Sequence, residues 1–200
     1  MRLGVLAFGS LISNPGWELE EITAERLTAV ATPFRVEYAR HSLVRGGAPT
    51  LVPVNRGGSR VSGVMLVIAD GIDLAEVRDR TYRRERNAVG SGLRYRHVAN
   101  PSPDAVYLPV NGPLAGIDAV VHVVLGDTIP EPQRTPEHLA RMAIASVSNT
   151  EAGRDGISYL RDAINAGIET PLTGSYRQAI LSATGTESLD EALAKARSGS

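Results

Sequence analysis

Two short stretches of this sequence carry residues that suit chemistry on a small polar ligand. The first is Gly9-Ser10-Leu11, which follows an apolar run at residues 2–8 and precedes a turn with Pro15 and Gly16. A glycine lets a ligand approach the main chain closely, and consecutive N–H groups in a turn form a positive concavity that can hold a carboxylate or another anion. An ordinary connection between a strand and a helix explains the same residues, so this stretch alone leaves both interpretations open.

The second stretch is the charged run at residues 81–87, in which Glu85 is the only carboxylate. A solvated helix end explains most runs of this kind, because arginine side chains favour the negative end of the helix dipole. Glu85, however, continues in helical steps the apolar stripe that begins at Leu74 and Val77, and it lies at the helix end that disfavours a carboxylate. A carboxylate on a buried face suits a general acid/base.

The hydropathy pattern predicts the elements that would position both stretches. Apolar runs and period-two alternation predict strands at residues 2–8, 34–39, 50–54, 61–68, 94–98 and 105–110, and a strand or buried helical turn at 120–125. Helical periodicity and capping residues predict helices at residues 17–27, 73–84, 136–148, 156–166, 175–183 and 188–197. Strands first and helices later predict an α+β fold around a mostly antiparallel or mixed sheet.

The bulk properties narrow the class of protein. The length suits a single domain over residues 1–200, with a helical C-terminal part at about 135–197. The absence of cysteine excludes disulfides, thiolate metal sites and a cysteine nucleophile. A formal net charge of −1, with acidic and basic residues interspersed, provides no field to attract nucleic acid or an anionic membrane.

The sequence also lacks the apolar segments of a membrane or secreted protein. No apolar run approaches the ~20 residues of a membrane span, and the stretch before Gly9 is too short for a signal peptide. We therefore expect a cytoplasmic protein. The strong preference for Arg over Lys, with Lys195 the only lysine, fits a GC-rich bacterial genome.

Other chemistries fit the sequence less well. Residues 4–10 match the first part of a phosphate-binding P-loop, but the lysine before the serine is missing. An esterase of the GDSL type, with Ser10 as nucleophile, would need an aspartate before that serine and a late Asp-x-x-His, and neither is present. No metal site is expected, because metal-ligand spacing is absent among the four histidines, His41, His97, His122 and His138.

The two stretches together resemble a known family. Phe8-Gly9-Ser10-Leu11 after an N-terminal strand resembles the [YF]GSL signature of the gamma-glutamylcyclotransferase-like family, with Phe8 in place of the commoner Tyr. In that family an Arg-Glu or similar pair ends the helix after the hairpin strands, and Arg84-Glu85 falls at that place. Tyr95 is similar to the aromatic residue that lines the family's cavity, after a loop longer than usual.

Further segments extend the resemblance along nearly the whole chain. Residues 38–46 are similar to the strand before the family's Pro-rich hairpin, and residues 63–66 to its "GVhh" strand. Residues 137–181, including Gly156-Ile157-Ser158-Tyr159-Leu160, are similar to the helical tail of the glutathione-degrading branch.

The resemblance implies a fold, an activity and a set of site residues. The fold would be a small mixed, barrel-like β-sheet with flanking helices. The enzyme would cyclise an N-terminal γ-glutamyl group to 5-oxoproline and release the attached amine or peptide. Glu85 would be the catalytic acid/base, and the substrate would be bound by Phe8, Gly9, Ser10, Leu11 and Tyr95.

The resemblance implies no cofactor and no metal, and the only partner it implies is a γ-glutamyl small molecule; it is compatible with a homodimer. It leaves open whether the leaving group is that of glutathione, of a γ-glutamyl amino acid or of a γ-glutamyl amine. The alternative is a module that binds such a molecule without turnover, because fold resemblance supports a fold better than a function. The glutamate at position 85 favours the enzyme.

Overall fold

The computed structural model describes residues 1–199, which divide into two compact units. Unit 1 comprises Met1–Thr32 and Ser62–Gly126, and unit 2 comprises Pro33–Val61 and the chain from Asp127 onwards. The chain passes between the units three times, so neither is a continuous segment. The single domain over residues 1–200 stays a prediction, and residue 200 lies outside the described residues.

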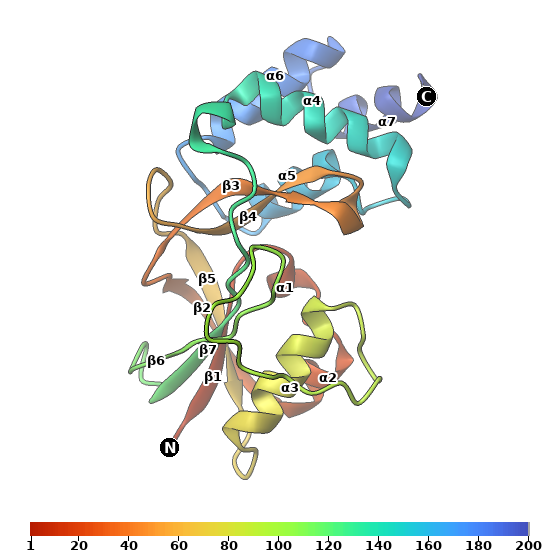
Figure 1. Ribbon diagram of the computed structural model, residues 1–200. Coiled ribbons are helices and arrows are strands. Elements are labelled where there is room, and N and C mark those ends of the chain that lie inside the picture. The colour runs from red at the N-terminus through yellow and green to blue at the C-terminus, as the bar shows by residue number, and fades with distance from the viewer. Residues whose placement is uncertain (200) are drawn as a thin grey trace. The chain divides into compact units, whose positions relative to one another are not determined.

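Unit 1 is built on a five-stranded mixed sheet (Figure 1). Its strands, in spatial order, are β2 (Thr23–Ala31), β5 (Ser62–Ile68), β1 (Leu3–Ala7), β7 (Ala119–His122) and β6 (Val110–Asn111). The central strand β1 pairs antiparallel with β5 and parallel with β7. All five residues of β1 are buried, as its continuous apolar run predicts. The α+β class is therefore confirmed.

The sheet is open, so the barrel-like closure that we expected is not present. Within residues 1–199, strand β2 pairs only with β5, and β6 pairs only with β7. Strand β6 is two residues long and stands between Pro109 and Pro113, which cannot donate to a ladder. Strand β2 has an irregular register between Leu27 and Val30, where Ala29 has a positive φ of 59°. Neither edge is a regular strand that could close the sheet.

Three helices belong to unit 1: α1 (Ser10–Ser13), α2 (Trp17–Ile22) and α3 (Leu74–Glu85). Asp73 caps α3 as the sequence predicts, because its Oδ1 accepts a hydrogen bond from the N–H of Glu76 at 2.8 Å. Buried side chains from α1, α2 and α3, such as Leu11, Leu19 and Val77, pack with those of β1, β5 and β7 in one apolar cluster. This cluster fixes the helices against the sheet.

The predicted helix over residues 17–27 is wrong in its second half. Helix α2 ends at Ile22, and residues 23–31 form β2, which pairs antiparallel with β5. The side chain of Thr23 donates to the carbonyl of Leu19 at 2.7 Å, and the carbonyl of Ile22 accepts from the N–H of Ala69. Long-range pairing with β5 outweighs the local helical periodicity here.

The strands predicted at residues 94–98 and 105–110 are also wrong for most of their length. Residues 94–98 form no regular element, and only Val110–Asn111 form a strand, with an isolated bridge between Tyr107 and Val124. Side chains of α3 take the place of a partner strand: Asp79 accepts the N–H of Tyr95 at 2.7 Å, and Arg83 donates to the carbonyl of Leu93 at 3.1 Å. The segment is therefore held to a helix rather than to the sheet.

Unit 2 combines a two-stranded antiparallel sheet with four helices (Figure 1). The strands are β3 (Arg35–Ser42) and β4 (Ala48–Val54), and the helices are α4 (Pro136–Ser146), α5 (Gly156–Asn165), α6 (Thr173–Thr184) and α7 (Leu189–Ser198). Short 3₁₀ turns lie at Leu43–Arg45, Glu131–Gln133 and Val147–Asn149. Each of the four helices lies within about two residues of its predicted position. Within residues 1–199, no helix has the length and apolar character that a membrane span requires.

A buried carboxylate lies in the core of unit 2. Glu37 is 3% exposed and accepts hydrogen bonds from the hydroxyl of Thr170 at 2.6 Å and from the N–H of Tyr38 at 2.9 Å. Burial raises the pKa of Glu37 above its ordinary value, although these hydrogen bonds act in the opposite direction. The folded protein therefore binds the proton of Glu37 more tightly than the unfolded chain does.

This raised pKa predicts a specific pH dependence of stability for Glu37→Gln. Because the unfolded chain gives up the proton at lower pH, the carboxylate costs the folded state stability as the pH rises above about 4.5. The free energy of unfolding should therefore fall less between about pH 5 and about pH 7 in the variant than in the wild type. Urea unfolding followed by circular dichroism measures this difference. Glu151→Gln, at a side chain that is 84% exposed, is the control, and parallel profiles for Glu37→Gln and wild type would contradict the assignment.

Candidate functional site

The predicted substrate loop begins where the central strand of unit 1 ends. Phe8 is buried, and Gly9 has φ 69° and ψ −142°, a combination that is accessible essentially to glycine alone. Ser10 and Leu11 are the first residues of α1, so their N–H groups have no acceptor one turn earlier within that helix. The side chain of Leu11 is buried in the apolar cluster and anchors the loop.

The end of α3 is held to α2 by charged side chains that are only partly exposed. The Nε of Arg83 donates to both carboxylate oxygens of Glu18, at 2.9 and 2.8 Å, and both side chains are less than 10% exposed. Burial raises the pKa of Glu18, but the hydrogen bonds and charge of Arg83 outweigh this and hold it below the ordinary value. Arg80 donates to the carbonyl of Glu18 at 2.6 Å and pairs with Glu21 at 2.7 Å. Arg80 and Arg83 therefore anchor this end of the helix, whereas Arg86 just beyond it is exposed.

Arg84 connects the end of α3 to the substrate loop. Its Nη1 donates to Oε1 of Glu85 at 2.5 Å, and its Nη2 donates to the hydroxyl oxygen of Ser10 at 3.2 Å. Its Nε and Nη2 donate to the carbonyl of Asn14 at 2.9 and 2.7 Å. The structure thus brings Glu85 and Ser10, two of the residues predicted from the sequence, to the same guanidinium group.

The geometry of Glu85 leaves one carboxylate oxygen available. The side chain is 12% exposed, and only Oε1 has a hydrogen-bond partner within residues 1–199. One oxygen thus fixes the orientation of the carboxylate, while Oε2 has no hydrogen-bond partner among the described residues. This arrangement suits a general acid/base, which must be both oriented and accessible.

Ser10 has no partner that would make it a nucleophile. A serine hydroxyl needs a general base that accepts its proton. The hydroxyl oxygen of Ser10 instead accepts a hydrogen bond from Arg84, and the described residues offer it no histidine or carboxylate acceptor. The hydroxyl hydrogen is therefore free to donate to a ligand.

Tyr95 follows α3 in the chain and packs against Tyr82 of that helix, but no hydrogen bond or ring contact joins it to the loop within the described residues. Its ring packs edge to face against Tyr82, with centroids 5.6 Å apart, and its hydroxyl accepts the N–H of Leu108 at 3.2 Å. No hydrogen bond, ion pair or ring contact joins Tyr95 to Glu85 or to Gly9–Leu11 within the described part of the chain. Its predicted role in substrate binding stays a prediction.

The described residues contain no cluster of three or more His, Cys, Asp or Glu side chains that could hold a metal ion. His122 is 5% exposed within β7, its Nδ1 lies 3.2 Å from the amide nitrogen of Asn111, and burial lowers its pKa to about 4. It is a neutral core residue near neutral pH.

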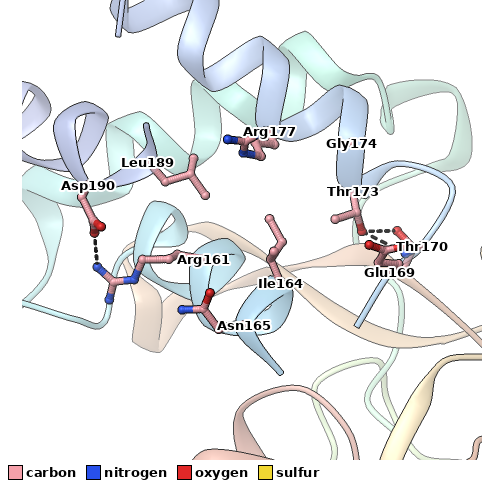
Figure 2. A pocket seen from close by; sticks show the side chains of 10 residues that line it. All are labelled: Arg161, Ile164, Asn165, Glu169, Thr170, Thr173, Gly174, Arg177, Leu189 and Asp190. Atoms are coloured by element: carbon pink, nitrogen blue, oxygen red, sulfur yellow. Dashed lines mark hydrogen bonds and ion pairs between the residues drawn. The ribbon is translucent and has the colours of Figure 1, made fainter. Parts of the chain in front are cut away.

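A pocket of about 490 Å³ lies in unit 2, and its lining contains none of the site residues predicted from the sequence (Figure 2). Figure 2 shows the Arg161–Asp190 ion pair at one end, Thr170 and Thr173 at the other, and Ile164 between them. The remaining lining residues are Asn165, Glu169, Gly174, Arg177 and Leu189. Several of its polar groups bind one another or the core behind it, since Asp190 pairs with Arg161 and the hydroxyl of Thr170 donates to Glu37.

Sequence reasoning identified Glu85 and the loop but missed the contacts of Arg84 with Ser10 and Asn14. Those residues are separated from Arg84 by 74 and 70 positions, so no local pattern relates them. Gly16 carries no such signal, because its positive φ of 80° is reason enough for a glycine there, and an added Cβ would lie at an ordinary van der Waals distance of 3.4 Å from Cγ of Arg84.

No protein-family model matches the sequence, and no curated protein is significantly similar to it.

The backbone of Gly9 predicts the result of Gly9→Ala. An L-residue is strained at this φ and ψ, so the substitution should lower the free energy of unfolding by about 1–3 kcal/mol. Urea unfolding followed by the fluorescence of Trp17, the only tryptophan, measures the change in unit 1. Gly112→Ala is the matched control, because no atom lies within 4 Å of its added Cβ, and it should change the stability by less than about 0.5 kcal/mol. Equal stabilities for Gly9→Ala and Gly112→Ala would contradict the strained turn.

Proposed function

We propose that the chain is an enzyme of the gamma-glutamylcyclotransferase type. The free α-amine of an N-terminal γ-glutamyl group attacks its own γ-carbonyl, the bond to the attached amine breaks, and the products are 5-oxoproline and that amine. No water is consumed, and the γ-carbonyl oxygen remains in the product. Closure of a five-membered lactam has a high effective molarity, so the site mainly holds the folded conformer and moves protons.

Glu85 is the proposed acid/base of this reaction. Its free Oε2 takes the proton from the attacking amine and delivers it to the leaving amine. The observation that carries the proposal is the shared guanidinium of Arg84, which lies 2.5 Å from the carboxylate of Glu85 and 3.2 Å from the hydroxyl of Ser10. A carboxylate with a free oxygen, and a loop whose first helical N–H groups have no acceptor within α1, are thus within the reach of one small substrate.

The loop is proposed to bind the glutamyl head of the substrate. The N–H groups of Gly9, Ser10 and Leu11 hold its carboxylate, and one of them stabilises the oxyanion that develops on the γ-carbonyl. Phe8 and Tyr95 are proposed to line the cavity. We further propose that unit 1 carries the family's characteristic fold with its sheet left open, since the loop follows the first strand and the glutamate ends the helix after β5.

We propose a cytoplasmic enzyme that acts on a γ-glutamyl small molecule without a metal or cofactor, either as a monomer or as a homodimer. The formal net charge of −1 and the interspersed charges argue against nucleic acid and anionic membranes as partners.

Glu85→Gln is expected to lower turnover on the order of 100-fold or more, because one group handles both proton transfers. The amide keeps the shape of the side chain and removes its basicity. Formation of 5-oxoproline from γ-glutamyl-alanine, γ-glutamyl amines and glutathione measures the rate and also identifies the leaving group.

Glu76→Gln is the control for Glu85→Gln, because it makes the same change on the same helix at a side chain that is 40% exposed. It should leave turnover close to wild type. A folded Glu85→Gln variant with near-wild-type activity would remove Glu85 from the mechanism. Asp79, which is bound to the N–H of Tyr95, and the buried Glu37 would then be the other carboxylates to test.

Acetylation of the substrate's α-amine is expected to abolish product formation. The amine is the nucleophile, so an N-acetyl group removes its basic lone pair and adds bulk where the ring closes. An amidase uses water or an enzyme side chain as nucleophile and need not be stopped by this change. Mass spectrometry of the acids released from free and N-acetylated γ-glutamyl-alanine distinguishes the two mechanisms.

Cleavage of the blocked compound at a comparable rate would contradict cyclisation. Binding of γ-glutamyl compounds without any release of 5-oxoproline would instead favour the binding module, the second candidate function.

A further inference from the structure

We propose that Arg84 is a positioning residue that fixes the distance between Glu85 and the Gly9–Leu11 loop. This inference rests on the proposed function, because those two features are the halves of the proposed site. The same guanidinium binds both halves, and no other side chain in the described part of the chain has hydrogen bonds to both.

The contacts of Arg84 use its guanidinium in a way that sets a geometry. Nε and Nη2 together bind the carbonyl of Asn14, which lies just after α1, and this pair of bonds defines the plane of the group. Nη1 then points to Glu85, and Nη2 also reaches Ser10. The side chain is only 16% exposed, so water competes little for these donors.

The pairing of Arg84 with Glu85 does not follow from their positions in the helix. Adjacent helical residues point about 100° apart and do not normally face each other. The two side chains converge because Arg84 turns towards the carbonyl of Asn14, while its neighbour Arg83 is held elsewhere by Glu18. The stem of Arg84 passes close to Gly16, where an added Cβ would lie 3.4 Å from Cγ, at ordinary van der Waals distance.

Lysine cannot reproduce this arrangement. Its ammonium group is a single point of charge, whereas the guanidinium is a planar fork whose separate nitrogens bind separate acceptors. Arg84→Lys therefore keeps the charge beside Glu85 but loses the fixed distance between the carboxylate and the loop. Arg84→Met loses both the charge and the distance.

The test compares Arg84→Lys and Arg84→Met with Arg86→Met and wild type. Arg86 is an exposed arginine just after α3, so its substitution removes the same charge without touching the site. Both Arg84 variants should lower kcat by about 10- to 100-fold, since small misplacements of reacting groups have effects of this size, with KM changed by less than about threefold. Arg86→Met should retain wild-type kcat.

Hydrogen exchange provides a readout that does not depend on activity. Amides of residues 9–16 should exchange faster in both Arg84 variants than in wild type and Arg86→Met, because the loop has lost its hydrogen bonds to α3.

Guanidinium ion added to Arg84→Ala should restore part of the lost kcat, as expected when a missing group rather than a damaged fold limits the rate.

Three outcomes would overturn the inference: full kcat in Arg84→Lys, unchanged exchange of residues 9–16 in Arg84→Met, or equal losses in Arg84→Met and Arg86→Met. Failure of the proposed function gives a different result. In that case wild type forms no 5-oxoproline from any γ-glutamyl compound, while the exchange measurement still decides whether Arg84 holds the loop.

Discussion

The pairing of β1 along both of its edges is the constraint on which the structure of unit 1 depends. Its main chain bonds to β5 on one side and to β7 on the other, and all of its side chains are buried. The exit of the chain at Ala7 therefore cannot shift without disrupting the sheet. Gly9 turns the chain sharply, and Leu11 returns it to the core, so the sheet itself places the loop whose N–H groups face a ligand in our proposal.

The last turn of α3 is a second part of unit 1 whose position is fixed, as that of β1 is. The buried pair of Arg83 and Glu18 and the contacts of Arg80 hold this turn to α2. Removing one partner of a buried ion pair leaves an uncompensated charge, which is strongly unfavourable, so the pair resists separation. Arg84 then connects the last turn of α3 to the loop that follows β1. The strand and the helix end are rigid parts of the fold. Because Arg84 binds to both, the carboxylate of Glu85 and the Gly9–Leu11 loop are held at a defined distance.

The parts of the fold that could be predicted from the sequence are those determined by local chemistry. Asp73, Thr135, Asp155 and Ser188 each accept the N–H three residues later, and the helices that they cap lie close to their predicted positions. The buried run of β1 and the glycine after it were equally visible. Glu85 could be identified as a candidate because a charged residue on an apolar stripe breaks a local rule.

The parts that could not be predicted depend on distant residues. Residues 23–27 continue a helical pattern, yet they form a strand because β5 offers main-chain partners. Residues 94–98 alternate like a strand, yet Asp79 accepts the N–H of Tyr95, and Arg83 binds the carbonyl of Leu93 just before them. The bridge made by Arg84 joins positions about seventy residues apart, and only the folded chain brings them together.

The origin of the oxygen atoms in the product tests cyclisation most directly. Reaction of γ-glutamyl-alanine in water enriched in ¹⁸O, followed by mass spectrometry, reports whether water attacks the γ-carbonyl. Intramolecular aminolysis predicts 5-oxoproline of unchanged mass, because the γ-carbonyl keeps its oxygen and no water is consumed. Glutamate that carries an ¹⁸O atom as the first product would contradict it and identify a hydrolase.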